Sequence, residues 1–255
     1  MRKIFTLIAF VAAMLTATTA SAQEDKMLFN HLSVGLDVGT TGWGLEVATP
    51  CTPYVTFRAG FATVPSFSYT YDKDGGVKYK NHGVEHRAPF KGTLHKTDFK
   101  LLADLYPIKG ASFHFTVGFF AGRSDFVTAK NTAPLVCDPG EGLEINDGEI
   151  ISPDANGNAK ARIKVNGFKP YLGIGFGRSI STDKKFNVSC DLGVQFWGKP
   201  KLQAYKNEDL QLDIPGHWTE VLSGVDDEDF NDALDIVHKV KVWPTMTIRF
   251  IYNIF

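Results

Sequence analysis

The chain has 255 residues, among them 24 Gly, 20 Phe and 12 Pro, and its formal net charge is −1. This near-neutral balance is too mild to imply a nucleic-acid partner or a basic surface for anionic lipid. Three cysteines are an odd number for an exported protein, and we expect no disulfide.

Residues 1–22 have the pattern of a signal peptide. Arg2 and Lys3 precede an apolar run over 4–15, and Ala20-Ser21-Ala22 is a small-residue cleavage motif. The apolar run is shorter than the roughly 20 residues that a spanning helix needs, so a retained anchor is the weaker alternative. The mature chain, 23–255, has a charge of 25 − 28 = −3.

The first strand pattern covers 31–38, and the second covers 43–47. Apolar residues occupy even positions in the first and odd positions in the second, and Gly39-Thr40-Thr41-Gly42 separates them. Such a phase change indicates either a tight hairpin or a β-bulge. The hairpin makes the number of strands even.

The middle of the chain continues with alternating segments. Strands are predicted over 54–64, 99–106 and 113–126, with short turns at 49–53 and 107–110. We expect two prolines to prevent continuous pairing in the first turn. Residues 65–91 form a long hairpin extension, and the polar segment 130–164 is predicted to be a long loop.

The hairpin over 168–205 shows the alternation most clearly. Leu172, Ile174 and Phe176 share one face, Tyr171 and the glycines at 173, 175 and 177 share the other, and residues 186–196 resume the pattern. The second face carries Gly, carboxylates and amides, without the Lys and Glu of a soluble surface. A lipid-facing exterior around a polar interior fits this pattern. A soluble lipocalin-like barrel with an apolar interior is the competing fold.

The end of the chain contains a predicted helix and a final strand. Residues 225–240 have helical spacing with an acidic first turn, and the last strand covers 240–255. Short turns alternate with long segments along the whole chain. The prediction is therefore an all-β protein, an eight-stranded antiparallel transmembrane β-barrel with long extracellular loops and one short helix before the last strand. Both termini are then periplasmic, and the aromatic C-terminal strand would engage the outer-membrane assembly machinery.

Several motifs in order resemble a known family. The core Val-Gly-Thr-Thr-Gly-Trp-Gly within 35–47, the segments 103–107, 170–176 and 198–201, and an acidic helix leading into Val242-Trp243-Pro244 are similar to small Gram-negative outer-membrane barrels of the CarO type. The resemblance implies an eight-stranded barrel with porin-like roles in uptake of basic amino acids and in antibiotic permeability. The long loops have no counterpart in it, so it implies no particular substrate here.

The inward face of the predicted barrel carries the candidate functional residues. They are Asp37, Glu46, Arg58, Lys100, Asp104, His114, Tyr171, Asp191, Gln195 and Arg249. The interior of an eight-stranded barrel is just wide enough for its side chains to fill it. These residues therefore form either a paired network that seals the barrel or a narrow conduit in which carboxylates draw small cationic solutes.

The chain also offers residues for two other functions. The long loops could contact a partner surface, and His82, His86 and His95 near Ser66 and Ser68 lie where a lipid-modifying enzyme would place its site. They lack a nucleophile–base spacing, so we expect no enzyme, no cofactor and no metal. The expected partners are outer-membrane lipid and a small solute, with no nucleic acid.

Overall fold

A computed structural model describes residues 31–72, 76–137, 142–145, 149–151, 153–154, 156–180, 184–206, 217–220 and 241–254. The predicted signal peptide and the helix over 225–240 lie outside these residues. All the regular secondary structure among these residues is strand. They therefore include no helix that is long and apolar enough to cross a membrane.

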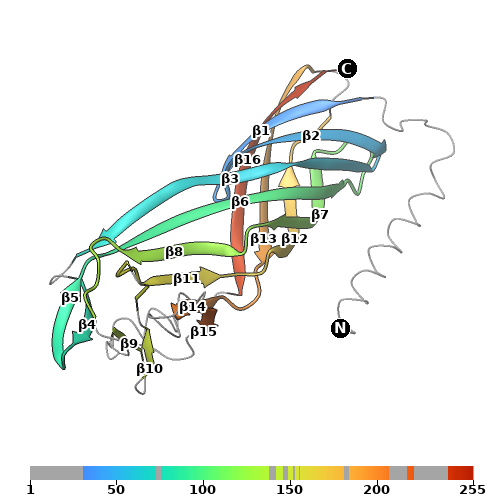
Figure 1. Ribbon diagram of the computed structural model, residues 1–255. Helices are drawn as coiled ribbons and strands as arrows, with labels where there is room; N and C mark the ends of the chain where they lie inside the picture. The colour runs from blue at the N-terminus through green and yellow to red at the C-terminus, as the bar shows by residue number, and fades with distance from the viewer. Residues whose placement is uncertain are drawn as a thin grey trace, which may run out of the picture.

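Eight antiparallel strands close into a barrel (Figure 1). In the order of their pairing they are β1 (Ser33–Gly39), β2 (Gly42–Thr52), β3 (Val55–Tyr71), β6 (Phe90–Leu105), β7 (Phe113–Gly122), β12 (Phe168–Phe176), β13 (Phe186–Phe196) and β16 (Val242–Asn253). The ring closes because β6 also pairs with β7. Closure leaves no unpaired edge in the wall, so the predicted fold class is confirmed.

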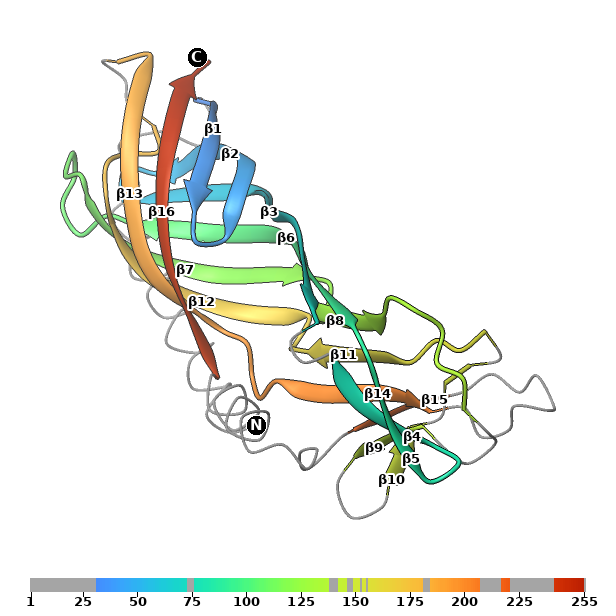
Figure 2. The ribbon, with the colours of Figure 1, turned by 90° about the vertical axis from the view of Figure 1, so that its left-hand side faces the viewer.

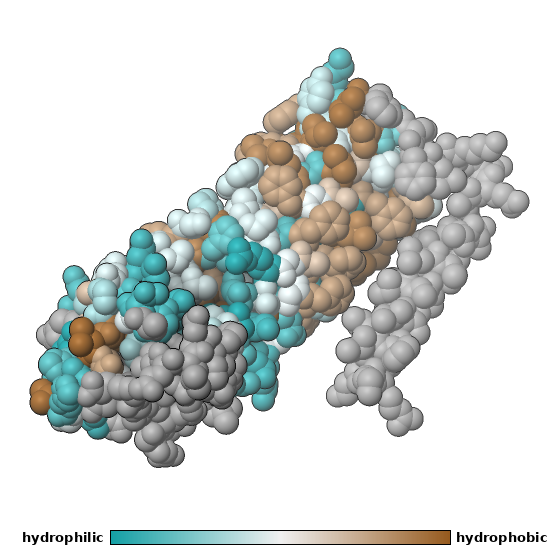
Figure 3. Space-filling model, viewed as in Figure 1, coloured by the Kyte–Doolittle hydropathy of each residue, from teal (hydrophilic) through white to brown (hydrophobic). Residues whose placement is uncertain are grey.

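The two faces of the barrel wall have opposite chemistry. Large apolar side chains point outward, and Phe176 and Phe186 are 63% and 58% exposed. Charged side chains such as Asp104 and Arg249 are completely buried inside. Figure 3 shows the resulting brown band over the barrel strands, which gives way to teal toward the end that holds β4 and β5. This is the arrangement of a barrel surrounded by lipid, and the lipocalin-like alternative is wrong.

The segment between β1 and β2 is a hairpin. Gly39 lies opposite Gly42, and Thr40 and Thr41 form the two-residue turn. Gly42 has φ +88°, and a Cβ there would lie 2.0 Å from the carbonyl oxygen of Thr63 on the neighbouring strand. Only glycine fits both constraints, so the hairpin interpretation is confirmed over the bulge.

The predicted turn at 49–53 is too long. Strand β2 pairs with β3 as far as Thr52, with Pro50 opposite Thr56 and a register shift beside it. The pairing of β2 with β1 ends at Ala48, which lies opposite Ser33. Beyond Ala48 that side of β2 has no strand partner, so Pro50 removes no hydrogen bond between β2 and β1. The chain reverses only at Pro53 and Tyr54.

Two predictions about the middle of the chain are wrong. The strand expected over 113–126 ends at Gly122, and β8 (Asp125–Asn131) begins after a break. The expected loop over 130–164 contains strands, including β11 (Lys160–Lys164). The length of β6 explains the additional strands. Its residues 98–105 pair with β7 in the barrel wall, but its residues 90–94 extend beyond the barrel. The backbone groups of residues 90–94 need other partners, and β8 supplies them.

These partners build a second structure, which we call the distal sheet. It consists of the ends of β3 and β6 with β8, β11, β14 (Lys201–Lys206) and β15 (His217–Glu220), paired in that order. Figure 2 shows β3 and β6 passing from the barrel into this sheet, far from the C-terminus. Two small hairpins, β4 (Val77–Asn81) with β5 (Val84–Ala88) and β9 (Leu143–Ile145) with β10 (Glu149–Ile151), complete the strands.

Candidate functional site

The interior of the barrel holds a charge-balanced set of buried side chains. Among the described residues, five carboxylates and five cations are buried there, so their formal charges sum to 5 − 5 = 0. They are Asp37, Glu46, Asp98, Asp104 and Asp191 with Arg58, Lys96, Lys100, Lys169 and Arg249. The structure places every candidate residue of the sequence analysis in this interior, including His114, Tyr171 and Gln195.

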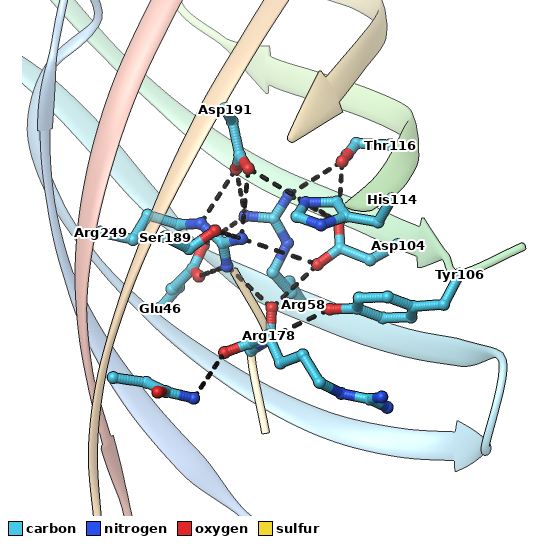
Figure 4. A network of polar contacts seen from close by, with 12 residues as sticks. Glu46, Arg58, Asp104, Tyr106, His114, Thr116, Arg178, Ser189, Asp191 and Arg249 are labelled. Atoms are coloured by element: carbon cyan, nitrogen blue, oxygen red, sulfur yellow. Dashed lines mark hydrogen bonds and ion pairs between the residues drawn. The ribbon is translucent and has the colours of Figure 1, made fainter. Parts of the chain in front are cut away.

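Arg249 on β16 is at the centre of the network. Its guanidinium lies 3.0 Å from Glu46 Oε1 and 2.9 Å from Asp191 Oδ2. It also donates hydrogen bonds to the hydroxyl oxygens of Ser179, at 2.8 Å, and Ser189, at 2.7 Å. One side chain thus joins β2 and β13 with the turn after β12 (Figure 4).

Arg58 on β3 makes a second junction. It lies 2.8 Å from Asp104 Oδ1 and 3.0 Å from Asp191 Oδ2, and its third carboxylate is Glu46 at 3.5 Å. Lys100 pairs with Glu46 at 2.6 Å and contacts Asp37 as well. The two arginines and Lys100 therefore share Glu46, which makes the pairs one connected unit.

His114 on β7 connects the network to the turn that precedes this strand. Its Nε2 lies 3.1 Å from Asp191 Oδ1, and its Nδ1 lies 3.2 Å from the carbonyl oxygen of Ser112. Nearby, Asp104 accepts hydrogen bonds from Thr116 and Ser179, both at 2.8 Å. The sequence alternation places His114 inward but gives no sign of Ser179, which lies outside the strands.

A second cluster lies toward the distal sheet. Lys169 donates to Asp98 at 2.6 Å, and Lys96 lies 3.3 Å from the same carboxylate and donates to Gln195 at 3.0 Å. Lys96 also lies 5.0 Å from the ring centroid of Trp197. Sequence reasoning missed Lys96, Asp98 and Lys169. The signal for all three was available: Lys96 and Asp98 continue the even-numbered inward positions of Lys100 and Asp104 along β6, and Lys169 lies two residues before the inward Tyr171 on β12.

Apolar side chains and glycines fill the remaining interior. Tyr171 packs with Ala62, Leu102 and Phe120. A Cβ on Gly193 would lie 2.4 Å from the Tyr171 hydroxyl, so this inward glycine makes room for the ring. The cavity beside Tyr171 has about 20 Å³, which is space for one or two water molecules.

The histidines and serines of the enzyme alternative lie outside the barrel interior. Ser66 Oγ is 3.1 Å from His95 Nδ1, beside a pocket of about 340 Å³ that Arg123 and Asp125 also line. Asp125 pairs with Arg162, and within the described part of the chain no carboxylate pairs with His95. A Ser–His pair without an orienting group does not complete a nucleophilic site. Nor does the described part of the chain contain a group of metal-ligating side chains.

Comparison with known proteins finds similar crystal structures, including two from Acinetobacter baumannii. No protein-family model matches the chain, and no curated protein matches it. CarO2 of Acinetobacter baumannii is 18% identical, with a TM-score of 0.49 over 88% of this chain and 99% of that chain. CarO of Acinetobacter baumannii is 16% identical, with a TM-score of 0.48 over 90% and 99%. Both are CarO proteins, the type that the sequence motifs resemble.

Proposed function

We propose that this protein is an outer-membrane β-barrel whose interior is sealed and whose working surface is the distal sheet. The observation that carries the proposal is the pairing of the interior. Each of the five buried carboxylates lies within 4.0 Å of a buried cation, and each cation is paired in turn.

The energetics of buried charge favour sealing over conduction. Separating a buried ion pair leaves an uncompensated charge, at a cost of about 3–5 kcal/mol. A solute that passes through must separate several such pairs at once, because Glu46 and Asp191 are each shared between two arginines. A set whose charges sum to zero also offers a cation no net attraction.

Two features support a location in the outer membrane: the apolar belt, which is the band of outward apolar side chains around the barrel wall, and the position of the turns. A closed barrel satisfies its backbone hydrogen bonds internally, which suits a wall surrounded by lipid. The turns between β2 and β3, between β6 and β7, and between β12 and β13 lie at the end that holds the C-terminus, and the distal sheet lies at the other end (Figure 1). The two-residue turn between β1 and β2 lies on the side away from the C-terminus. In outer-membrane barrels short turns are periplasmic. We therefore place both termini in the periplasm and the distal sheet outside the cell.

Cysteine labelling in intact cells tests this orientation. In a variant with Cys51, Cys137 and Cys190 replaced by serine, Val84→Cys marks the β4–β5 hairpin and Ile108→Cys marks a short turn. Both native side chains are exposed, at 57% and 69%. A membrane-impermeant maleimide should label Val84→Cys in intact cells, and Ile108→Cys only after the outer membrane is permeabilised. The reverse pattern would invert the orientation.

Planar-bilayer recording of the refolded protein tests the sealed interior. Heat-modifiable migration on a gel first verifies that the barrel has folded. We expect no conductance steps, and no swelling of liposomes in lysine or sodium gradients. Reproducible cation-selective steps would refute sealing and support the conduit alternative. In that case Asp104→Ala and Asp191→Ala should lower the cation permeability.

A further inference from the structure

The outward face of the distal sheet is basic. On β6, Phe99 and Leu101 point outward from the barrel, so the odd-numbered residues before them, including the exposed Lys91, share this face. Residues directly opposite on neighbouring strands share it too. The basic face therefore contains Lys91, Lys130, Lys160, Arg162, Lys164 and Lys201.

Its lysines stand directly opposite one another. Lys130 on β8 lies opposite Lys91 on β6 and opposite Lys160 on β11, which makes a row of three across adjacent strands. Lys164 lies opposite Lys201 in a second row. Opposite positions bring Cβ atoms to about 4.5–5.5 Å, where like charges destabilise a sheet. Two such rows need anions to balance them.

The protein itself supplies only part of this balance. Lys160 pairs with Asp154 at 3.3 Å, Arg162 pairs with Asp125 at 3.3 Å, and Lys201 pairs with Glu220 at 2.7 Å. Within the residues that the structure describes, Lys91, Lys130 and Lys164 form no ion pair. Two of the three lysines in the first row and one of the two in the second therefore have no ion pair in the described part of the chain.

Aromatic side chains fix the middle of the basic face. The guanidinium of Arg162 lies 4.0 Å from the ring centroid of Trp218, and Lys160 lies 5.6 Å from that of Tyr205. The two rings pack edge to face at 5.3 Å. Cations held over rings on a rigid sheet lose less conformational freedom when they bind an anion.

The basic face continues the apolar belt. Lys164 precedes the outward Phe168 of β12 by four residues, which span at most about 14 Å. Lys91 precedes Phe99 by eight residues, roughly 26 Å. The face therefore lies beyond the outward aromatic side chains of the barrel, with Lys164 nearer to them along the chain than Lys91.

We propose that the basic face binds the phosphate groups of a phosphorylated glycolipid in the outer leaflet. Lys160 and Lys164 set the two rows roughly 13 Å apart, a spacing that suits a headgroup with one phosphate at each end. The acyl chains of the same molecule would lie against the apolar belt below. This inference rests on the proposed outer-membrane orientation and is independent of whether the barrel conducts.

Titration of the detergent-purified protein tests the proposal. The probe is a six-chain glycolipid with a bisphosphorylated diglucosamine headgroup, and binding is followed by native mass spectrometry and tryptophan fluorescence. Lys130→Gln and Lys164→Gln should each weaken binding about fivefold, since one cation at a lipid surface contributes about 1 kcal/mol. Lys130→Arg should bind like the wild type.

The controls separate lipid from other anions and charge from folding. Lys185→Gln removes an exposed lysine at the opposite end of the barrel and should leave binding unchanged. Equal binding of the dephosphorylated glycolipid, or an equal loss in Lys185→Gln, would overturn the phosphate site. Inositol hexakisphosphate that binds as tightly as the glycolipid would overturn the lipid assignment in favour of a soluble polyanion. The titration uses micelles, so its result does not depend on conductance.

Discussion

Replacing Arg249 by methionine tests how the interior network contributes to stability. The substitution keeps an unbranched side chain of comparable reach but removes the charge that Glu46 and Asp191 share. The interior would then hold five carboxylates and four cations. Because the site is completely buried, water cannot compensate for the loss.

The expected magnitude follows from this burial. Removing one partner of a buried ion pair costs about 3–5 kcal/mol. At an m-value of about 2 kcal/mol/M, the midpoint of urea unfolding in lipid vesicles falls by about 2 M. The double variant Arg249→Met with Glu46→Gln restores the balance of charge, and should recover about 0.5–3 kcal/mol of that loss. Tryptophan fluorescence and heat-modifiable migration on a gel measure the unfolding of the single and the double variant.

A half-exposed ion pair gives the matched control. Lys78 and Glu85 lie 3.5 Å apart, with side chains 53% and 61% exposed. Lys78→Met should cost less than about 1 kcal/mol, because exposed pairs contribute little. If Arg249→Met cost no more than Lys78→Met, or the double variant recovered nothing, the claim of a connected buried network would be refuted.

Two further predictions concern packing and pH. A Cβ on Gly175 would lie 2.2 Å from Asp191 Oδ1 and 2.4 Å from His114 Nε2, so Gly175→Ala should lower the free energy of unfolding by about 1–3 kcal/mol. A Cβ on Gly92 would meet nothing closer than 3.8 Å, so Gly92→Ala should change that free energy by no more than about 1 kcal/mol. Urea titrations measure both. Equal effects of the two alanines would contradict the proposed close packing. Burial alone would raise the pKa of Asp154, but hydrogen bonds from the backbone and side chain of its loop hold that pKa below its ordinary 3.8. The loop is therefore stabilised above pH 3.8 and loses that stabilisation as the pH falls through the lowered pKa. Below pH 3.8 the loop amides should lose protection from hydrogen exchange, measured relative to the intrinsic exchange rate at each pH. Asp154→Asn should remove this pH dependence.

Much of the barrel could be predicted from the sequence because its information is local. Period-two alternation assigns each side chain to the inner or outer face by geometry alone. It placed Asp104, His114 and Arg249 inside the barrel before any pairing was known. The glycines at 39 and 42 marked the first interruption of the pattern, and the structure shows why they are needed: Gly42 has φ +88°, and a Cβ on Gly39 would lie 2.0 Å from the carbonyl oxygen of Met246.

The break after Gly122 and the distal sheet could not be predicted in this way. A polar segment such as 130–164 has too little alternation to identify strands, and the partner of β8 is the far end of β6, more than thirty residues earlier. The basic face exists only because that pairing sets Lys91, Lys130 and Lys160 side by side.

The sequence by itself thus determined which residues face lipid and which face the interior, since that depends on neighbours two positions apart. Only the tertiary structure decided which interior charges meet. Arg249 reaches Glu46 because β16 closes the barrel against β1, which brings together residues 203 positions apart. Closure is a property of the whole ring of strands, and no single segment carries it.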